Sequence, residues 1–242
     1  MSYLYVAHQG SGQDGQLYFT FTRDGSNWEP DRQVPTFGMS DSPSALFFND
    51  QLYCFYQGSG ENGELRYTST ADATNWAPDR QVPNVGMSAG PGARVGFNNR
   101  LYCFHQGSGQ DGQLYYTSTP DGVDWAADKQ VPISGMSDSP GVTVFKNKIY
   151  CFYQGSGEDG QILFTSTPDG ITWAAEETVP NVGMSAGPAV VVYNDLLYLF
   201  YQSSGDSGQL MYITNDGSNW QPHDQQIPTA VGMSAGPSAC YG

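Results

Sequence analysis

The residues of this chain that could recognise a ligand lie in two short loops that recur along the sequence. The tetrapeptide Gln-Gly-Ser-Gly starts at Gln9, Gln57, Gln106 and Gln154, and returns as Gln-Ser-Ser-Gly at Gln202. The tripeptide Gly-Met-Ser recurs with its methionine at Met39, Met87, Met136, Met184 and Met233. Glycine backbone, serine hydroxyls, a glutamine amide and a thioether can together match the hydroxyls and the apolar face of a small neutral polyol. We therefore take these two loops as the candidate binding segments.

An aromatic or imidazole side chain comes directly before each glutamine and would lie beside the loop. It completes the candidate sugar-binding set. By repeat, this set comprises His8, Gln9 and Ser11 with Met39 and Ser40; Tyr56, Gln57 and Ser59 with Met87 and Ser88; His105, Gln106 and Ser108 with Met136 and Ser137; Tyr153, Gln154 and Ser156 with Met184 and Ser185; and Tyr201, Gln202 and Ser204 with Met233 and Ser234. One such site is expected to bind near millimolar, or about 4 kcal/mol. Several on one molecule would gain avidity on clustered glycans of glycoproteins, glycolipids or cell surfaces.

The same repetition argues against catalysis and against a metal site. Catalysis needs residues in different roles that converge on one place, whereas this chain repeats nearly everything in each copy. A pair of carboxylates from different repeats, such as Glu64 and Glu176, keeps a glycosidase open as an alternative. The loops at 13–15 and 206–208 offer one carboxylate each, which is poor for calcium. No metal or other cofactor is expected.

Composition excludes two further classes of partner. The chain has 242 residues and a formal charge of −15, from 24 acidic and 9 basic side chains with no basic run. Binding to a nucleic-acid backbone or an anionic membrane needs clustered Lys and Arg. No apolar stretch is long enough to span a membrane, and the N-terminus lacks the pattern of a signal peptide. We expect cytosolic synthesis, with release by a route without a signal peptide left open.

The positions of the cysteines indicate free thiols in the protein core. Cys54, Cys103 and Cys151 occupy one position in three repeats, where the other two copies have Val6 and Leu199. A side chain that interchanges with valine and leucine is expected to be a small core residue. The prediction is therefore free buried thiols rather than disulfides or a metal site.

The elements that would position the loops repeat with them. The Gln-Gly-Ser-Gly copies are spaced by 48, 49, 48 and 48 residues, and a tryptophan recurs in step at Trp28, Trp76, Trp125, Trp173 and Trp220. One repeat contains four strand-like runs, for example 44–48, 52–57, 64–69 and 76–82, separated by Gly, Asn and Asp turns. Aromatic and β-branched enrichment favours strands. No segment has a sustained helical period, so helices should be nearly absent.

Four strands per repeat, five times over, predict an all-β fold of the five-bladed β-propeller type in one domain, 1–242. The predicted blades are 2–36 plus 237–242, 43–84, 91–132, 140–180 and 188–228. The C-terminal run would pair with the N-terminal strand in a composite blade and close the ring, which removes a sheet edge. An open β-solenoid is the competing fold. Strand alternation places both candidate loops on the same face.

A second repeated turn carries a resemblance to a known family. Thr119-Pro120-Asp121-Gly122 leads to Trp125, and related segments occur in the other copies, although the second copy has Ala73 in place of glycine. This resembles the Asp box of sialidases and other propellers, one residue shorter between Asp and Trp. In that family the box is structural. We expect its Asp to accept backbone N–H groups, its Gly to adopt positive φ and its Trp to pack between blades.

The architecture resembles that of propeller lectins, of the five-bladed tachylectin-2 type or of similar bacterial and fungal proteins. The resemblance implies a multivalent, non-enzymatic sugar-binding protein. The arginine triad of sialidases is not evident, and neither is the Arg, Glu and Trp set that six-bladed fucose-binding lectins repeat, so no motif identifies the sugar.

Three alternatives stay open at this stage. Recent duplication of one repeat would also conserve the loops, without any binding role. A protein-interaction platform or an acidic storage protein would share the architecture. Oligomeric state is not predicted by the sequence.

Overall fold

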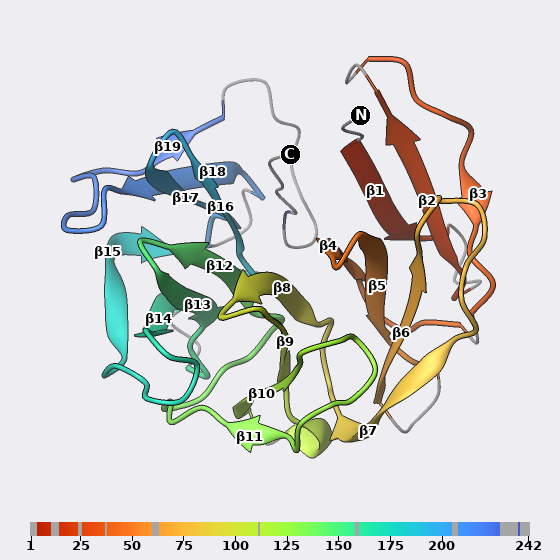
Figure 1. The fold of residues 1–242 in the computed structure, drawn as a ribbon. Coiled ribbons are helices and arrows are strands. Elements are labelled where there is room, and N and C mark those ends of the chain that lie inside the picture. The colour runs from red at the N-terminus through yellow and green to blue at the C-terminus, as the bar shows by residue number, and fades with distance from the viewer. Residues whose placement is uncertain are drawn as a thin grey trace. The chain divides into compact units, whose positions relative to one another are not determined.

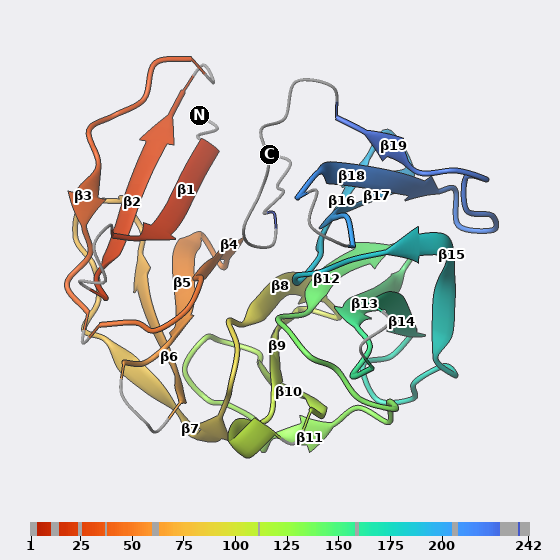
Figure 2. The same cartoon turned by 180° about the vertical axis from the view of Figure 1, so that it is seen from behind.

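The computed structural model describes residues 4–10, 15–23, 26–36, 38–59, 63–110, 112–157, 160–204, 208–227 and residue 237. Within them the chain consists of short antiparallel strands, together with the 3-10 turn η2 at Ser108–Gln110. The strands form one three-stranded sheet and four four-stranded sheets (Figure 1). Neither view of this part of the chain shows a helical layer over a sheet (Figures 1 and 2).

Each sheet is made from one sequence repeat. The first contains β1 (Leu4–Gln9), β2 (Leu17–Thr22) and β3 (Arg32–Gln33); the second β4 (Ser44–Phe48), β5 (Gln51–Gln57), β6 (Glu64–Thr70) and β7 (Arg80–Gly86); the third β8 (Gly92–Phe97), β9 (Arg100–Gln106), β10 (Leu114–Thr119) and β11 (Lys129–Gln130); the fourth β12 (Gly141–Phe145), β13 (Lys148–Gln154), β14 (Gln161–Thr167) and β15 (Glu177–Gly183); and the fifth β16 (Ala189–Tyr193), β17 (Leu196–Gln202), β18 (Leu210–Asn215) and β19 (Gln225–Gln226). Strands that are neighbours in sequence are neighbours in each sheet. The predicted four-stranded repeat is therefore confirmed, with three strands described in the first sheet.

Turn chemistry explains the hairpins between the first two strands of a sheet. Asn49 and Asp50 have φ of 47° and 60°, and Asn194 and Asp195 have φ of 49° and 60°. Two consecutive residues with positive φ match the twist of the flanking strands, and Asn and Asp tolerate this conformation well. These dipeptides therefore set the register of each hairpin.

The chain divides into two compact bodies. One contains Met1–Gln110, Tyr116–Lys129 and Gly242, and the other contains Asp111–Tyr115 and Gln130–Tyr241. The first body holds the first two sheets and most of the third. The second body holds the fourth and fifth sheets.

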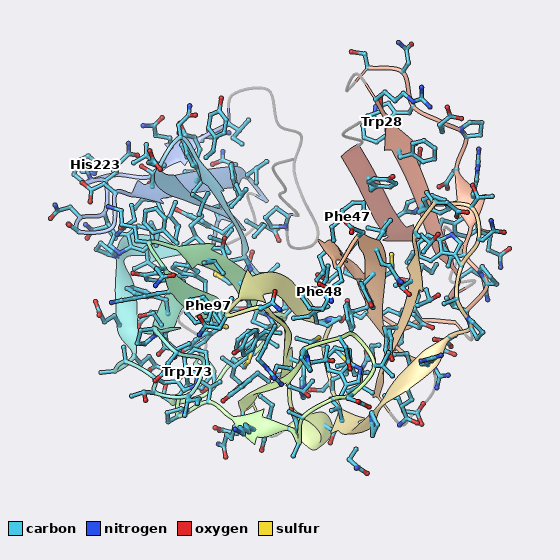
Figure 3. All side chains as sticks on the ribbon, in the orientation of Figure 1. Trp28, Phe47, Phe48, Phe97, Trp173 and His223 are labelled. Atoms are coloured by element: carbon cyan, nitrogen blue, oxygen red, sulfur yellow. The ribbon has the colours of Figure 1, made fainter. Side chains whose placement is uncertain are left out.

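Tryptophans pack three of the repeats onto the sheet before them. Trp76, which follows β6, meets Phe19 of β2 edge-on, with ring centroids 5.1 Å apart. Equivalent contacts join Trp125 to Phe55 at 5.7 Å and Trp220 to Phe152 at 6.0 Å. The predicted packing role is confirmed for these three. Trp28 differs, being 44% exposed (Figure 3), because no described sheet precedes it in the chain.

Both faces of a sheet are apolar in this arrangement. Phe48 of β4 is 5% exposed in the core, whereas its neighbour Phe47 points to the other face and is 50% exposed (Figure 3). Successive side chains of a strand alternate between faces. Phe47 contacts Tyr5 of β1, with ring centroids 5.3 Å apart, so this second face also packs against a neighbouring sheet.

The fourth strand of a repeat differs from the prediction of 76–82. In the second sheet β7 begins at Arg80, whereas Trp76 forms an isolated bridge with Thr70. The bridge closes the turn after β6, so strand pairing resumes only beyond it. The fourth strand has seven residues in β7 and β15 but two in β3, β11 and β19.

Several fold predictions can now be compared with the structure. The all-β class with five repeated sheets is confirmed. The C-terminal run at 238–242 lies outside the described residues, so the composite blade and the single-domain organisation stay predictions. Cys54, Cys103 and Cys151 are free and buried as expected, and burial raises the pKa of the Cys54 thiol to about 12. Among the described residues, no helix has the length and apolarity to cross a membrane.

Candidate functional site

Methionines of the Gly-Met-Ser loops lie in the core. Met39 and Met87 are 2% exposed, and Met136 and Met184 are 1% exposed. A thioether at this depth packs against the protein and does not offer its surface to a ligand. The expectation that it faces a sugar does not fit this burial, and ligand contact falls to the residues around it.

Each of the four described Gly-Met-Ser segments runs between the loops of two consecutive sheets. The N–H of Met87 donates to Gly63 O of the second sheet at 2.7 Å, and the N–H of Ser88 donates to Gln106 O of the third at 3.3 Å. Gly63 has φ 53°, and a Cβ there would lie 2.0 Å from Met87 O, so only glycine fits. We name this arrangement of a Gly-Met-Ser segment and its two flanking Gln-Gly loops the loop junction.

Glutamine side chains are used inside the loop junction. Gln57 Nε2 donates to Met87 O at 2.8 Å, and Gln57 Oε1 accepts from Ser40 Oγ at 2.9 Å. Gln9 and Gln154 likewise donate to Met39 O and Met184 O, both at 3.1 Å. An amide that is satisfied on both sides ties one sheet to the next. A structural requirement therefore accounts for much of the sequence identity of these loops across the repeats.

Serines of both loops stay at the surface. Ser40, Ser59, Ser108, Ser137, Ser156, Ser185 and Ser204 are exposed, and Ser88 is half-buried. Ser59 N–H donates to Gly38 O at 3.0 Å, so the serines of one junction adjoin, and the two loops share an edge as predicted. Ser11, Met233 and Ser234 lie outside the described residues. The structure thus brings together the serines, among the predicted site residues, at an accessible surface.

The aromatic residue before each glutamine contacts a carboxylate that the sequence analysis missed. Tyr56, Tyr153 and Tyr201 donate through their hydroxyls to Asp79, Glu176 and Asp224 at 2.5, 2.6 and 2.5 Å, and Nε2 of His8 and His105 lies 3.1 Å from Asp31 and Asp128. We name these the aromatic–carboxylate pairs. The partner comes 23 residues later every time, and this constant spacing is the signal that could have revealed it.

These pairs are framework in most repeats. Tyr56, Tyr153, Tyr201 and His105 are buried, and His8 is partly exposed. Burial, followed by the adjoining carboxylate, raises the pKa of Tyr56 well above its usual value. A tyrosine in this setting stays protonated and serves as a donor, not as a nucleophile or base.

The turns that resemble Asp boxes hold themselves together. Asp121 Oδ1 accepts the N–H groups of Val123 and Asp124, each at 2.8 Å, and Gly122 has φ 80°. Asp72, Asp169 and Asp216 make the same bonds. Such bonds lower the pKa of Asp169 to about 2. The expected hydrogen bonds from backbone N–H groups to the carboxylate are present at these four aspartates, and Asp24 lies outside the described residues.

The two glutamates of the glycosidase alternative are engaged within their own bodies. Glu64 Oε2 lies 2.8 Å from a terminal nitrogen of Arg66. Glu176 accepts from Tyr153 and, at 2.7 Å, from Ser134 Oγ. Burial opposes ionisation of Glu176, but these hydrogen bonds hold its pKa below the usual value, whereas a general acid needs a raised pKa. Within the described ranges, no three His, Cys, Asp or Glu side chains are grouped to hold a metal ion.

Solved structures share this architecture. Aleuria aurantia lectin, a six-bladed β-propeller, matches with a TM-score of 0.68 and 16% identity over 94% of this chain and 74% of that one. A lectin from Burkholderia pseudomallei matches with a TM-score of 0.68 and 15% identity over 88% and 64%. A sialidase from Streptococcus pneumoniae gives 0.58 and 16% over 78% and 32%. No protein-family model and no curated protein sequence matches.

At these identities the similarity shows the fold alone. Together with the five antiparallel sheets, it identifies the chain as a β-propeller protein with five repeated blades. The fold is compatible with both binding and catalysis, so function has to be argued from the surface residues.

Proposed function

We propose that this protein is a non-enzymatic, multivalent lectin, with up to five sugar sites at the rim formed by the loop junctions. The observation that carries the proposal is the similarity of 94% of the chain to a solved propeller lectin. Glycans of glycoproteins, glycolipids or cell surfaces would be its partners. Synthesis in the cytosol belongs to the same proposal.

Surface chemistry supports a neutral ligand. Exposed serine hydroxyls at each described junction, such as Ser40 with Ser59, can exchange hydrogen bonds with sugar hydroxyls. Glu64 and Glu176 are already paired within the protein, which argues against this pair as the acids of the glycosidase alternative. A weak single site of about 4 kcal/mol would reach useful strength only through several copies.

A glycan array tests this proposal, with free monosaccharides as competitors. The variant is Ser59→Glu, Ser108→Glu, Ser156→Glu and Ser204→Glu together, which places charge at four junctions. The matched control places the same charge on four equivalent exposed hairpin tips: Ser26→Glu, Thr74→Glu, Val123→Glu and Ile171→Glu.

We expect saturable, competed binding for the wild type and the control, and its loss in the junction variant. A blank array with folded wild-type protein would overturn the lectin proposal and favour a protein-interaction or storage role. Equal binding by both variants would show that the sugar sites do not lie at the loop junctions.

A further inference from the structure

The five repeats differ at one surface position beside the otherwise constant loop. This position lies on the third strand of a repeat, and in the first, second, fourth and fifth repeats it is paired with the residue that forms the aromatic–carboxylate pair. It is Tyr18, Arg66, Tyr115, Leu163 or Met211. The register pairs His8 with Tyr18 and Tyr56 with Arg66. All five are half-buried, and the repeats present four different side-chain types at this place, with tyrosine in two of them.

In the second and fourth repeats this variable side chain lies directly against the loop junction. A Cβ on Gly58 would come within 2.9 Å of Arg66 Cδ, and one on Gly155 within 3.1 Å of Leu163 Cδ1. The glycine of the Gln-Gly pair therefore leaves room for whichever side chain the strand carries. Gly58 and Gly155 form bridges with the buried methionines of their junctions. A ligand held at the junction would meet the variable side chain.

The first and third repeats share a histidine and a tyrosine that the others lack. Tyrosine occupies the variable position only where histidine forms the aromatic–carboxylate pair, as in His8 with Tyr18 and His105 with Tyr115. Both repeats also carry a hydrogen-bonded pair of glutamines. Gln33 Nε2 donates to Gln16 Oε1, and Gln130 Nε2 donates to Gln113 Oε1, each at 2.9 Å. The fifth repeat has glutamine at the same two positions, so the histidine and the tyrosine are what distinguish the first and third repeats.

In the first sheet these residues form a row across three strands. Tyr18 of β2 is paired with His8 of β1 on one side and with Gln33 of β3 on the other. The rings of His8 and Tyr18 stack with centroids 5.9 Å apart at 17°. His8 and its partner Asp31 have side chains 42% and 46% exposed. An accessible aromatic ring therefore lies between an imidazole with its carboxylate and a pair of amides.

We infer that the first and third repeats hold the sugar sites, with Tyr18 and Tyr115 as the rings on which the ligand packs. The inference rests on the proposed function, and it reduces the number of sugar sites from up to five to two. The ligand class is a neutral pyranose with an apolar C–H face, because an aromatic ring covers such a face. Amide and carboxylate oxygens beside the ring accept from its hydroxyls. Arg66, Leu163 and Met211 offer no such ring.

The test uses side chains that sister repeats already carry. Tyr18→Leu, Tyr115→Leu and the double variant introduce the residue of the fourth repeat. Met211→Leu is the control on the fifth. Methyl glycosides of fucose, galactose, N-acetylglucosamine and mannose are the probes, each at about 10 mM because a single weak site is expected near millimolar. Ligand-observed NMR measures binding, and fluorotyrosine-labelled protein reports on individual rings. The two fluorine resonances are assigned by their absence in the single variants.

We expect a glycoside to shift the resonances of Tyr18 and Tyr115 saturably, each single variant to halve the bound glycoside, and the double variant to lose it. Met211→Leu should bind as the wild type does. A double variant that binds a glycoside as well as the wild type, while unfolding at the same temperature, would overturn this inference and leave sugar binding intact. A wild type that binds no glycoside and no array glycan would overturn the proposed function itself.

Discussion

At the scale of the residue, the aromatic–carboxylate pairs come in two kinds with different dependence on protons. A tyrosine hydroxyl donates to its carboxylate while neutral, as in Tyr153 with Glu176 at 2.6 Å. In His8, Nδ1 lies 3.0 Å from Gln9 O and Nε2 lies 3.1 Å from Asp31 Oδ1. Both partners are acceptors, so only the doubly protonated ring satisfies them. The histidine pair therefore depends on pH and the tyrosine pair does not.

His8→Tyr should remove part of the pH dependence of stability. Burial lowers the pKa of His8, but hydrogen bonds to Gln9 O and Asp31 outweigh it, so the pKa is raised above 6.5. A raised folded-state pKa adds stability that is full below pH 6.5 and is lost as the pH rises through the folded-state value. We expect the stability of the wild type to decline relative to His8→Tyr over this window. The difference should be less than about 1 kcal/mol because the pair is exposed.

Thermal unfolding at a series of pH values measures this difference. His223→Gln changes a histidine outside the pairs and is the control, which should keep the wild-type profile. Parallel profiles for wild type and His8→Tyr would show that the ion pair contributes nothing.

At the scale of the element, the loop junction joins neighbouring blades by hydrogen bonds where strands do not pair. Gln57 bridges Met87 O and the Ser40 hydroxyl, and the buried methionine fills the space beneath. Substitutions in loops that make these hydrogen bonds should lower the stability of the protein. We therefore attribute the repeated sequence of these loops to their role in stability. The half-buried position on the third strand has no such role and can differ between repeats.

Gln57→Glu tests the junction. The change replaces the Nε2 donor with a carboxylate oxygen that faces Met87 O, which leaves a poorly paired charge and should cost about 1–3 kcal/mol of unfolding free energy at neutral pH. Urea denaturation measures it. Gln81→Glu, on an exposed position of β7, is the matched control and should change stability by less than about 0.5 kcal/mol. If the two variants lost equal amounts of unfolding free energy, the hydrogen bonds of the junction would not contribute to stability as proposed.

At the scale of the whole molecule, the first four repeats alternate with a two-repeat period. Asp41 Oδ2 accepts the N–H of Gly90, and Asp138 Oδ2 accepts that of Gly187, both at 2.9 Å. Short fourth strands, β3 and β11, precede the two aspartate loops, while the long β7 and β15 precede the loops with Ala-Gly. Duplication of a two-blade segment explains why the histidine and tyrosine set recurs in the first and third repeats and not in adjacent ones.

Net charge should make the protein discriminate against acidic glycans. The charge of −15 repels a sialylated glycan, and the repulsion acts over the Debye length of about 30 Å at 0.01 M salt but about 10 Å at 0.1 M. We expect neutral glycans to bind almost equally at both salt concentrations and their sialylated forms to bind more weakly at the lower one. Array binding at two salt concentrations checks this, and equal salt dependence for both glycan classes would contradict it.

Local chemistry was enough to predict much of this fold. The spacing of Trp and Gln-Gly, the Asn-Asp turns and the enrichment in aromatic and β-branched residues are each properties of one repeat, so they predict strands, hairpins and their number without reference to neighbours. The interchange of Cys54 with valine and leucine predicted a buried thiol for the same reason. The start of β7 escaped prediction because Trp76 closes a turn by pairing with Thr70.

The sequence by itself thus determined the repeated antiparallel unit and the segments that form its loops. Only the tertiary structure decided which loop side chains face solvent, because burial depends on the next repeat. Met87 is packed in one core cluster with residues of the second and third sheets, such as Leu65 and Leu101, and Tyr56 meets Asp79 across its own sheet. The same packing leaves Tyr18 half exposed between His8 and Gln33. Side-chain type sets what a residue can do, and the neighbouring strands set whether a ligand can reach it.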